Sequence, residues 1–448
     1  MSQQAPPDAG ASVAVTPDAG MPAAETDVIL GDLGVLLLEC GTSVTDVRGS
    51  LEQVSRRAAP ETTLEFAILP EMVMVSRPGS ASATTTVIGK GEALTFRQSA
   101  RASRLVRDLE MGTVPLDTAP ARMAAIRATP RRLPGAQSVI GCGLLSVSLA
   151  VLFRCPWWAA LLALVVGLLV GGLTILMMRV RAAAAVAPFV SAFVSTILVG
   201  VTANALDLGP VPLFAVCAPV AILVPGALIT NALLELTSTD IVTGASRLMY
   251  GLIMLAFMAA GLYAGAYLTG LRIDSASAAL VGEAVHLTSP GTGWAALPPL
   301  WTAWFAVLVL AVGIGLAFGS GLRLTLVCVV VMVGTYAVLA SFSPHVGSIV
   351  ATGIAAAVLF VAARVLERVT LAVPATVSFQ PAFLLLVPGT IGLVALASFD
   401  AQALASAPMM FLSLCIGTKV GALVADLARI TRSTIFLRWA RPARMGEL

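Results

Sequence analysis

Residues 219–226 read Pro-Val-Ala-Ile-Leu-Val-Pro-Gly, and residues 381–389 read Pro-Ala-Phe-Leu-Leu-Leu-Val-Pro-Gly. Both stretches end in Leu-Val-Pro-Gly, and the second copy follows the first after 163 residues. Proline removes a backbone donor and clashes with the preceding helical turn, while glycine permits backbone angles that other residues avoid. Each stretch therefore predicts an interruption in an otherwise apolar helix.

The sequence on either side of these stretches is apolar enough to cross a bilayer many times. Hydrophobic residues make up 58% of the 448 positions and charged residues only 11%, whereas soluble proteins carry roughly 25% charged residues. Windows of about 20 apolar residues, the length that spans the hydrocarbon core, follow one another after residue 134. We expect ten membrane spans, at residues 136–153, 157–178, 184–206, 211–234, 241–269, 296–318, 322–341, 345–363, 379–399 and 402–428.

The two Pro-Gly pairs hold the same place in this series, in the fourth span of each group of five. Because five is odd, a duplicated five-span unit must enter the membrane in opposite directions, the inverted-repeat plan of many secondary transporters. Unpaired backbone at such breaks is tolerated where it faces protein or a wet cavity. We therefore predict a substrate site at Pro225, Gly226, Pro388 and Gly389; the alternative for either pair alone is a simple kink.

Basic residues near the span ends give the orientation. With the N-terminus in the cytoplasm, 14 arginines from residue 122 onward fall on the cytoplasmic side and two on the other side, leaving out Arg247 and Lys419, which lie within predicted spans. The side richer in basic residues is normally the cytoplasmic one. Both termini are therefore predicted to be cytoplasmic, which requires an even number of spans.

The N-terminal part of the chain has a different composition. Of the 51 charged residues, 28 lie in the first 137 positions. The pattern there predicts helices over 28–38, 44–58, 96–111 and 119–128 and strands over 64–68, 72–76 and 84–88. The predicted organisation is a disordered acidic tail (1–27), a small α/β cytosolic domain (28–134), a first five-helix repeat (135–269), an extracytoplasmic loop (270–295), a second five-helix repeat (296–430) and a basic cytosolic tail (431–448). The fold class is mainly α.

Polar residues in the apolar region need a reason, since a charge at the bilayer centre costs about 2.5–3.5 kcal/mol on insertion scales. Asn231, Glu235 and Ser238 form one stripe at the inner end of the fourth span, and Asp240 and Arg247 follow at the start of the fifth. In a functional interpretation, Glu235 or Asp240 handles an ammonium group or a proton and Arg247 a carboxylate. In a structural interpretation, these groups lie at the interface and pair with each other across the turn.

Lys419 stands inside the tenth span, between Gly417 and Gly421, whose small size permits close helix contact. We consider it a pathway residue; the alternative is that its chain extends to the membrane surface. The scattered cysteines and two histidines predict neither a disulfide framework nor a metal site. The chain has no phosphate-binding loop, no nucleic-acid surface and no convincing nucleophile–base pair. We therefore expect no cofactor, no catalytic residues and no enzymatic activity.

These motifs together resemble the threonine/serine exporter family of bacterial inner membranes, over roughly residues 28–430. The resemblance rests on Leu36-Leu37-Leu38-Glu39-Cys40-Gly41-Thr42-Ser43-Val44, on Leu223-Val224-Pro225-Gly226 with Asn231, Glu235, Asp240, Gly244 and Arg247, and on Leu386-Val387-Pro388-Gly389 followed by Gly417 and Gly421. It implies ten spans, a cytosolic N-terminal domain, and export of L-threonine and L-serine across the inner membrane, driven by the proton motive force with H+ as coupling ion.

Two other functions stay open from the sequence. Relatives of the same architecture export dicarboxylates such as succinate, and for that cargo Arg247 and Lys419 would be the counter-charges. A membrane scaffold or sensor whose cytosolic domain binds a partner is a third interpretation, against which the paired helix breaks argue. An assembly of identical chains in the bilayer is compatible with each of the three.

Overall fold

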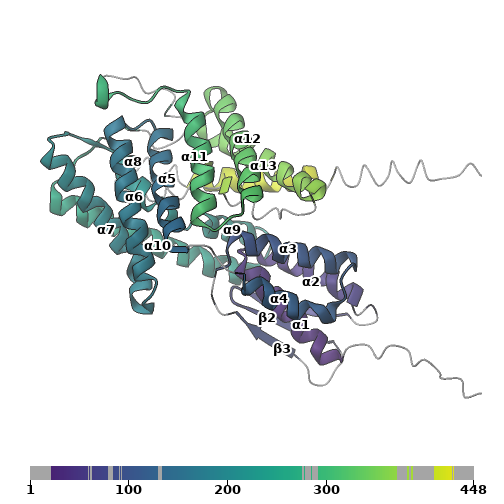
Figure 1. The fold of residues 1–448 in the computed structure, drawn as a ribbon. Coiled ribbons are helices and arrows are strands. Elements are labelled where there is room, and N and C mark those ends of the chain that lie inside the picture. Colours follow the sequence, from purple (N-terminus) through teal and green to yellow (C-terminus); the bar gives the residue numbers. More distant parts are fainter. Residues whose placement is uncertain are drawn as a thin grey trace, which may run out of the picture.

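The computed structural model describes residues 22–58, 60, 63–78, 84–89, 91, 93–129, 134–274, 277, 284, 291–370, 381–382, 385–386, 408–425 and 427. A small N-terminal unit of helices and strands lies against one end of a larger helical bundle (Figure 1). We call that end of the bundle the docking end; it comprises the C-terminal ends of α9, α11 and α13 and the start of α10.

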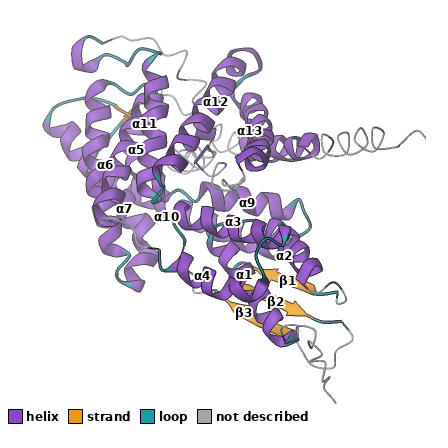
Figure 2. Ribbon diagram, turned by 45° about the vertical axis from the view of Figure 1, so that its right-hand side comes forward, coloured by secondary structure: helices purple, strands orange, loops and turns teal. Residues whose placement is uncertain are grey.

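The N-terminal unit is built on a three-stranded antiparallel sheet in the order β1-β2-β3. Helix α1 packs on β2 and β3, and helix α2 packs on β1. The two helices lie side by side against the sheet (Figure 2). Gly34 on α1 makes this packing close, because a Cβ there would meet the side chains of Leu51 and Val73 at 2.9 Å. The elements are α1 (Ala23–Glu39), α2 (Val44–Ala58), β1 (Glu65–Leu69), β2 (Met72–Ser76), β3 (Thr84–Ile88), α3 (Phe96–Met111), η1 (Leu116–Thr118) and α4 (Ala119–Arg127).

Helix α1 begins at Ala23, earlier than the start at residue 28 that the sequence pattern predicts. The reason is a pair distant in sequence: Asp27 is 1% exposed and accepts two hydrogen bonds of 2.8 Å from the Arg77 guanidinium. A buried carboxylate with a bidentate arginine partner anchors the first turns of the helix. The predicted acidic tail therefore extends too far, since residues 23–27 are helical and the described part of the chain begins at Pro22.

Most helices of the bundle are long and apolar. Within the described residues, seven are long and apolar enough to cross a membrane, or eight if one bent pair is a single span, and the shorter apolar α11 comes in addition. The helices are α5 (Pro134–Leu152), α6 (Trp157–Met177), α7 (Arg181–Ala205), α8 (Leu213–Cys217), η2 (Ala218–Leu223), α9 (Gly226–Leu236), α10 (Ile241–Thr269), α11 (Thr302–Ala317), α12 (Leu322–Val346), α13 (Ser348–Thr370) and the helix Pro408–Ala425. Two short pieces, β4 (Val211–Pro212) and β5 (Ile273–Asp274), pair in parallel, and η4 (Gly293–Ala295) precedes α11.

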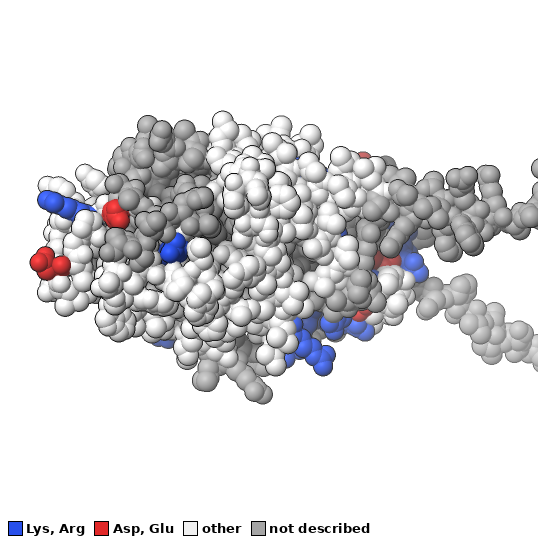
Figure 3. Space-filling model, turned by 90° about the horizontal axis from the view of Figure 1, so that it is seen from above, with Lys and Arg blue, Asp and Glu red and all other residues white. Residues whose placement is uncertain are grey.

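The outer faces of the bundle are apolar as well as its interior. On α6, Leu161 is 51% exposed and Leu169 54% exposed, yet Ala163 and Val170 of the same helix are fully buried. Few of the side chains visible on the face drawn in Figure 3 are charged. Helices that are hydrophobic on all sides are typical of membrane spans.

The fourth predicted span is broken where the sequence predicts it. The α8–η2 piece Leu213–Leu223 and helix α9 meet at an angle of 66°. Val224 has an extended backbone (φ −65°, ψ 122°), the conformation that a following proline favours, and α9 starts directly after Pro225. Gly226 is not among the glycines with positive φ, so the expectation that its conformational freedom makes the break is wrong; Val224 and Pro225 account for it.

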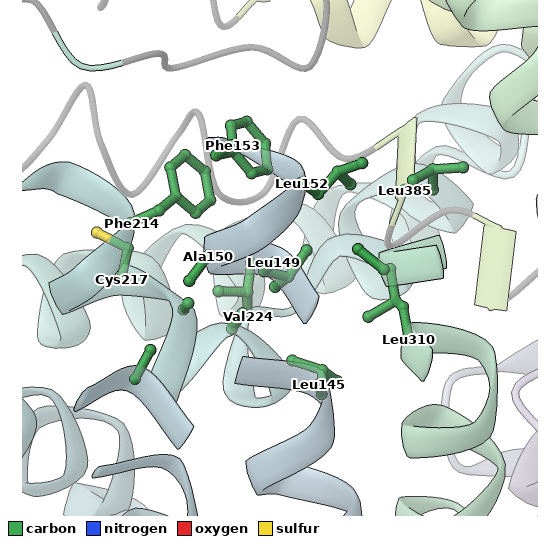
Figure 4. Close-up of a cluster of buried hydrophobic side chains, with 14 of the residues drawn as sticks. Leu145, Leu149, Ala150, Leu152, Phe153, Phe214, Cys217, Val224, Leu310 and Leu385 are labelled. Atoms are coloured by element: carbon green, nitrogen blue, oxygen red, sulfur yellow. The ribbon is translucent and has the colours of Figure 1, made fainter. Parts of the chain in front are cut away.

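The broken span lies inside the bundle. All of α8 and residues Ala218, Pro219, Val220 and Ala221 are buried, with contacts to α5, α6 and α7. The hydroxyl of Ser195 on α7 donates to the carbonyl of Val216 at 3.2 Å. A side chain of a neighbouring helix therefore supplies a hydrogen bond to the backbone of the broken span. Phe153 stacks on Phe214 just above this point (Figure 4).

The residues around the second Pro-Gly pair contribute to the same core. Leu385 and Leu386 are buried and belong to the apolar cluster that contains Val224 and Leu310 (Figure 4). Pro388 and Gly389 themselves lie outside the described residues. The break in the ninth span therefore stays a prediction.

Packing through small residues recurs in the two predicted halves. In the first half, Gly261 and Gly265 on α10 lie against α7; in the second, Gly417 and Gly421 of the helix Pro408–Ala425 lie against α13. In each pair the contacts advance in the same chain direction, so the third and fifth spans of each half are parallel. The spacing of four residues is typical of close contacts between membrane helices.

Helices α5 and α11, the first of each predicted half, run in opposite directions. A Cβ at Gly141, early in α5, would meet Ala317 at the end of α11, and one at Gly313 would meet Leu145, a turn further along α5. An inverted repeat requires this relation between its first helices. The complete ten-helix repeat stays a prediction, because most of the ninth span lies outside the described residues.

Candidate functional site

A cluster of polar side chains lies at the docking end, where the bundle meets the N-terminal unit. We call it the polar cluster; its members are Asn231, Glu235, Ser238, Asp240, Arg247 and Lys419. Five of them come from α9, α10 and the turn between them, and Lys419 comes from the helix Pro408–Ala425. All six lie at positions that the sequence analysis singled out.

Glu235 is the most buried member, with no exposed surface. Its Oε1 accepts a hydrogen bond from the main-chain N–H of Val44 at 3.0 Å and forms an ion pair with Arg247, whose side chain is 10% exposed. Its Oε2 has no hydrogen-bond partner among the described residues. Val44 is the first residue of α2, so the positive end of that helix dipole also faces the carboxylate.

The carboxylate of Asp240 accepts hydrogen bonds from two side chains of the N-terminal unit. Arg48 donates to both of its carboxylate oxygens, at 2.7 and 3.4 Å, and the hydroxyl of Thr45 donates at 2.9 Å. The Asp240 side chain is 11% exposed and that of Arg48 35%. A two-pronged arginine–carboxylate pair fixes orientation as well as distance.

The remaining members link further parts of the chain. Asn231 donates its amide N–H to the carbonyl oxygen of Gly41 at 3.1 Å. The ammonium of Lys419 donates to the Ser238 hydroxyl at 2.5 Å, which joins the two predicted halves of the bundle. Among the described residues, no carboxylate pairs with Lys419.

Other contacts hold the N-terminal unit to both halves of the bundle. Phe96, at the start of α3, donates its N–H to the carbonyl of Phe318 at 3.0 Å and stacks on the Phe318 ring, just past the end of α11. Asp46 on α2 lies 3.5 Å from Arg364 on α13. The hydroxyl of Thr243 on α10 reaches the carbonyl of Ile68 at 3.4 Å.

The structure does not bring all predicted pathway residues together. Pro225 and Glu235 lie at opposite ends of α9, about 15 Å apart at 1.5 Å rise per residue. One small amino acid, whose ammonium and carboxylate share a single carbon atom, cannot contact both at once. Pro225 and Glu235 therefore do not belong to one binding site for such a molecule.

The sequence pattern does not predict the partners of the polar cluster in the N-terminal unit. It indicates no chemistry for Gly41, Val44, Thr45 and Arg48, although the stretch 36–44 carries the family resemblance. One local signal was available: Ser43 caps α2, with its hydroxyl donating to Asp46 at 2.8 Å and accepting from the Asp46 N–H at 3.2 Å. A cap predicts where a helix begins, but it does not predict what its first N–H groups face.

The thiol of Cys40, at the end of α1, is unreactive. Burial raises the pKa of the Cys40 thiol to about 12, so it stays protonated at neutral pH. All six cysteines are free and buried, and no group of three metal-ligating side chains lies together among the described residues.

A family model described as "Putative threonine/serine exporter" (ThrE) matches residues 28–269. The chain belongs to this family. The match begins within α1 and ends at the last residue of α10, so it covers the N-terminal unit and the first five predicted spans. No curated protein and no solved structure matches the chain.

Membership agrees with what the bundle shows. ThrE is an exporter family, and the apolar helices are those of a multi-pass membrane protein. Both partners of each contact made by Asn231, Glu235 and Asp240 lie within residues 28–269, so the matched region includes both sides of this interface.

Proposed function

We propose that the protein exports small hydroxylated amino acids, L-threonine and L-serine, from the cytoplasm across the bacterial inner membrane, driven by the proton motive force. The family match supports the cargo class. The observation that carries the proposal is Glu235, a fully buried carboxylate at a helix end whose Oε2 has no partner among the described residues. Such an oxygen fits an ammonium group or a proton.

In this proposal the substrate passes two stations in succession. At the docking end, which we place in the cytoplasm, Glu235 and Asp240 receive the ammonium group. At the break in the fourth span, the first N–H groups of α9 receive the carboxylate, since a helix N-terminus without a side-chain cap favours an anion. The antiparallel first helices α5 and α11 support alternating access between two inverted halves.

One observation favours a second cargo. Lys419 has only a hydroxyl partner, Ser238, among the described residues, and an ammonium in this position fits a carboxylate. A dicarboxylate such as succinate would use it together with Arg247, although Arg247 is already paired with Glu235. That existing pair is why we place the amino acid first.

The deciding experiment is counterflow in proteoliposomes that contain the purified protein. Labelled threonine, serine and succinate are offered separately, with and without an imposed proton gradient. We expect exchange of threonine and serine, accelerated by the gradient, and none of succinate. Exchange of succinate alone would establish the second cargo, and no exchange of any of the three would favour a scaffold or sensor.

A further inference from the structure

Residues 41–48 of the N-terminal unit cover the polar groups at the ends of α9 and α10; we call this segment the plug. We propose that the plug is an internal competitor for substrate: it occupies the loading station, and substrate reaches Glu235 and Asp240 only when the plug withdraws. The inference rests on the proposed transport function and adds the regulation of the same site.

The plug offers the two carboxylates the kinds of donor that a hydroxylated amino acid carries. The main-chain N–H of Val44 donates to Oε1 of Glu235, on the same carboxylate to which an ammonium group would donate. The Thr45 hydroxyl donates to Asp240 at 2.9 Å, as the side-chain hydroxyl of threonine or serine would. With the plug in place Glu235 has no exposed surface and the Asp240 side chain is 11% exposed, so plug and substrate exclude each other.

The acceptor side of the match is made by Gly41. Its carbonyl oxygen accepts the amide N–H of Asn231 at 3.1 Å, the contact that a substrate carboxylate would make. Arg48, the last residue of the plug, donates to both oxygens of Asp240. A single short stretch of chain thus contacts Asn231 and Glu235 on α9 and Asp240 just before α10.

The plug has a fixed shape of its own. Ser43 and Asp46 cap the start of α2 reciprocally, and Gly41 takes a left-handed backbone angle (φ 76°) that turns the chain from α1 into α2. The segment therefore moves with α2 and does not need to unfold in order to leave.

The same unit also spans the two halves of the bundle. The plug holds α9 and α10 of the first half, while Phe96 holds the end of α11 and Asp46 contacts Arg364 on α13 of the second half. Separating the halves at this end, as alternating access demands, breaks one of these two sets of contacts. The contacts that block the station are the first set, which Gly41, Val44, Thr45 and Arg48 make to α9 and to Asp240; Asp46 is the plug residue that belongs to the second set.

The test uses a reporter cysteine, Asn231→Cys, at a position that the plug contacts. We measure how fast a hydrophilic maleimide labels this cysteine in the purified full-length protein in detergent, because labelling requires the plug to move away. The six native cysteines are buried and give a low background. Arg48→Ala removes the clamp on Asp240. The matched control is Arg56→Ala on the same helix, an exposed arginine whose one ion-pair partner in the described part of the chain is Glu52, on its own helix at 3.9 Å.

We expect labelling of the reporter to rise about two- to fivefold with Arg48→Ala, as the loss of a partly exposed ion pair allows, and to stay unchanged with Arg56→Ala. Thr45→Val should raise it further in combination with Arg48→Ala. Equal labelling in the parent, Arg48→Ala and the combined variant would overturn the plug.

The labelling does not depend on the identity of the cargo, so it tests the plug separately from the proposed transport function. In proteoliposomes, Arg48→Ala should also raise the rate of threonine exchange at low substrate by a similar factor, because a larger fraction of the protein is open. A rise in labelling without a rise in exchange at low substrate overturns the competition. If labelling rises but no variant exchanges any cargo, the plug is supported and the transport function is overturned.

Discussion

Variants of the ion pair between Glu235 and Arg247 distinguish a structural role of these two residues from a role in transport. Arg247→Met leaves a fully buried carboxylate with only the Val44 N–H as partner, and breaking a buried pair in this way costs about 3–5 kcal/mol. Glu235→Gln keeps the acceptor for Val44 and leaves an arginine that is 10% exposed, so we expect a smaller loss, about 1.5–3 kcal/mol. The double variant buries no charge at this position.

The double variant should therefore lose less stability than the sum of the two single variants. We expect a coupling free energy of about 2 kcal/mol, within the range for residues in direct contact. The assay is unfolding in detergent, followed by a thiol-reactive dye that reports exposure of the six buried cysteines. Strictly additive losses would refute the pair as the structure has it.

Efflux measured on the same four proteins then decides the role of Glu235. If the carboxylate receives substrate or a proton, the double variant regains stability but exports neither threonine nor serine. If it exports both at the parent rate, the pair only braces the turn between α9 and α10, and Glu235 leaves the mechanism. The comparison is clean because the double variant is expected to be folded.

Three further expectations concern separate parts of the molecule. Pro225→Ala lets the fourth span continue as a helix and should cut efflux at least tenfold with unchanged amounts in the membrane, whereas Pro188→Ala, inside the α7 helix, should leave efflux near the parent rate. Gly417→Ala places a methyl group against the backbone of the neighbouring helix and should cost about 1–3 kcal/mol in unfolding; Gly334→Ala, with open space around it, should be neutral or slightly stabilising. The Cys40 thiol, with its pKa raised to about 12 by burial, should resist alkylation in the folded protein. Because the unfolded chain ionises this thiol at lower pH than the folded one, its contribution to stability should be full below about pH 9 and lost as pH rises toward 12, and Cys40→Ala should remove this alkaline loss.

The local elements were predictable because each depends on neighbouring residues. The residue spans expected for α2, β2, β3 and α3 agree with the structure, since periodicity and caps lie within each span. The helix break after Leu223 was predictable for the same reason, as a proline acts on its own turn. The first turn of α1 was missed because Asp27 is held by Arg77, 50 residues away.

The polar stripe at the end of the fourth span was predictable, but its partners were not. Charges in apolar sequence are rare enough to be noticed singly, so Glu235, Asp240 and Lys419 were found one at a time. That Val44 and Arg48 lie against them depends on how the N-terminal unit docks on the bundle, across about 190 residues of chain. No periodicity within either part encodes that contact.

The docking also explains how a carboxylate can be fully buried at the end of a membrane helix. Taking the charge of Glu235 out of water costs several kcal/mol, which the interaction with Arg247 offsets only with good geometry and further hydrogen bonds. One of those further bonds, from Val44, comes from the N-terminal unit. When the plug withdraws, that bond is lost and water or substrate must replace it. In the proposed mechanism, the carboxylate of Glu235 loses this donor whenever the plug withdraws, and an ammonium group of the substrate replaces it.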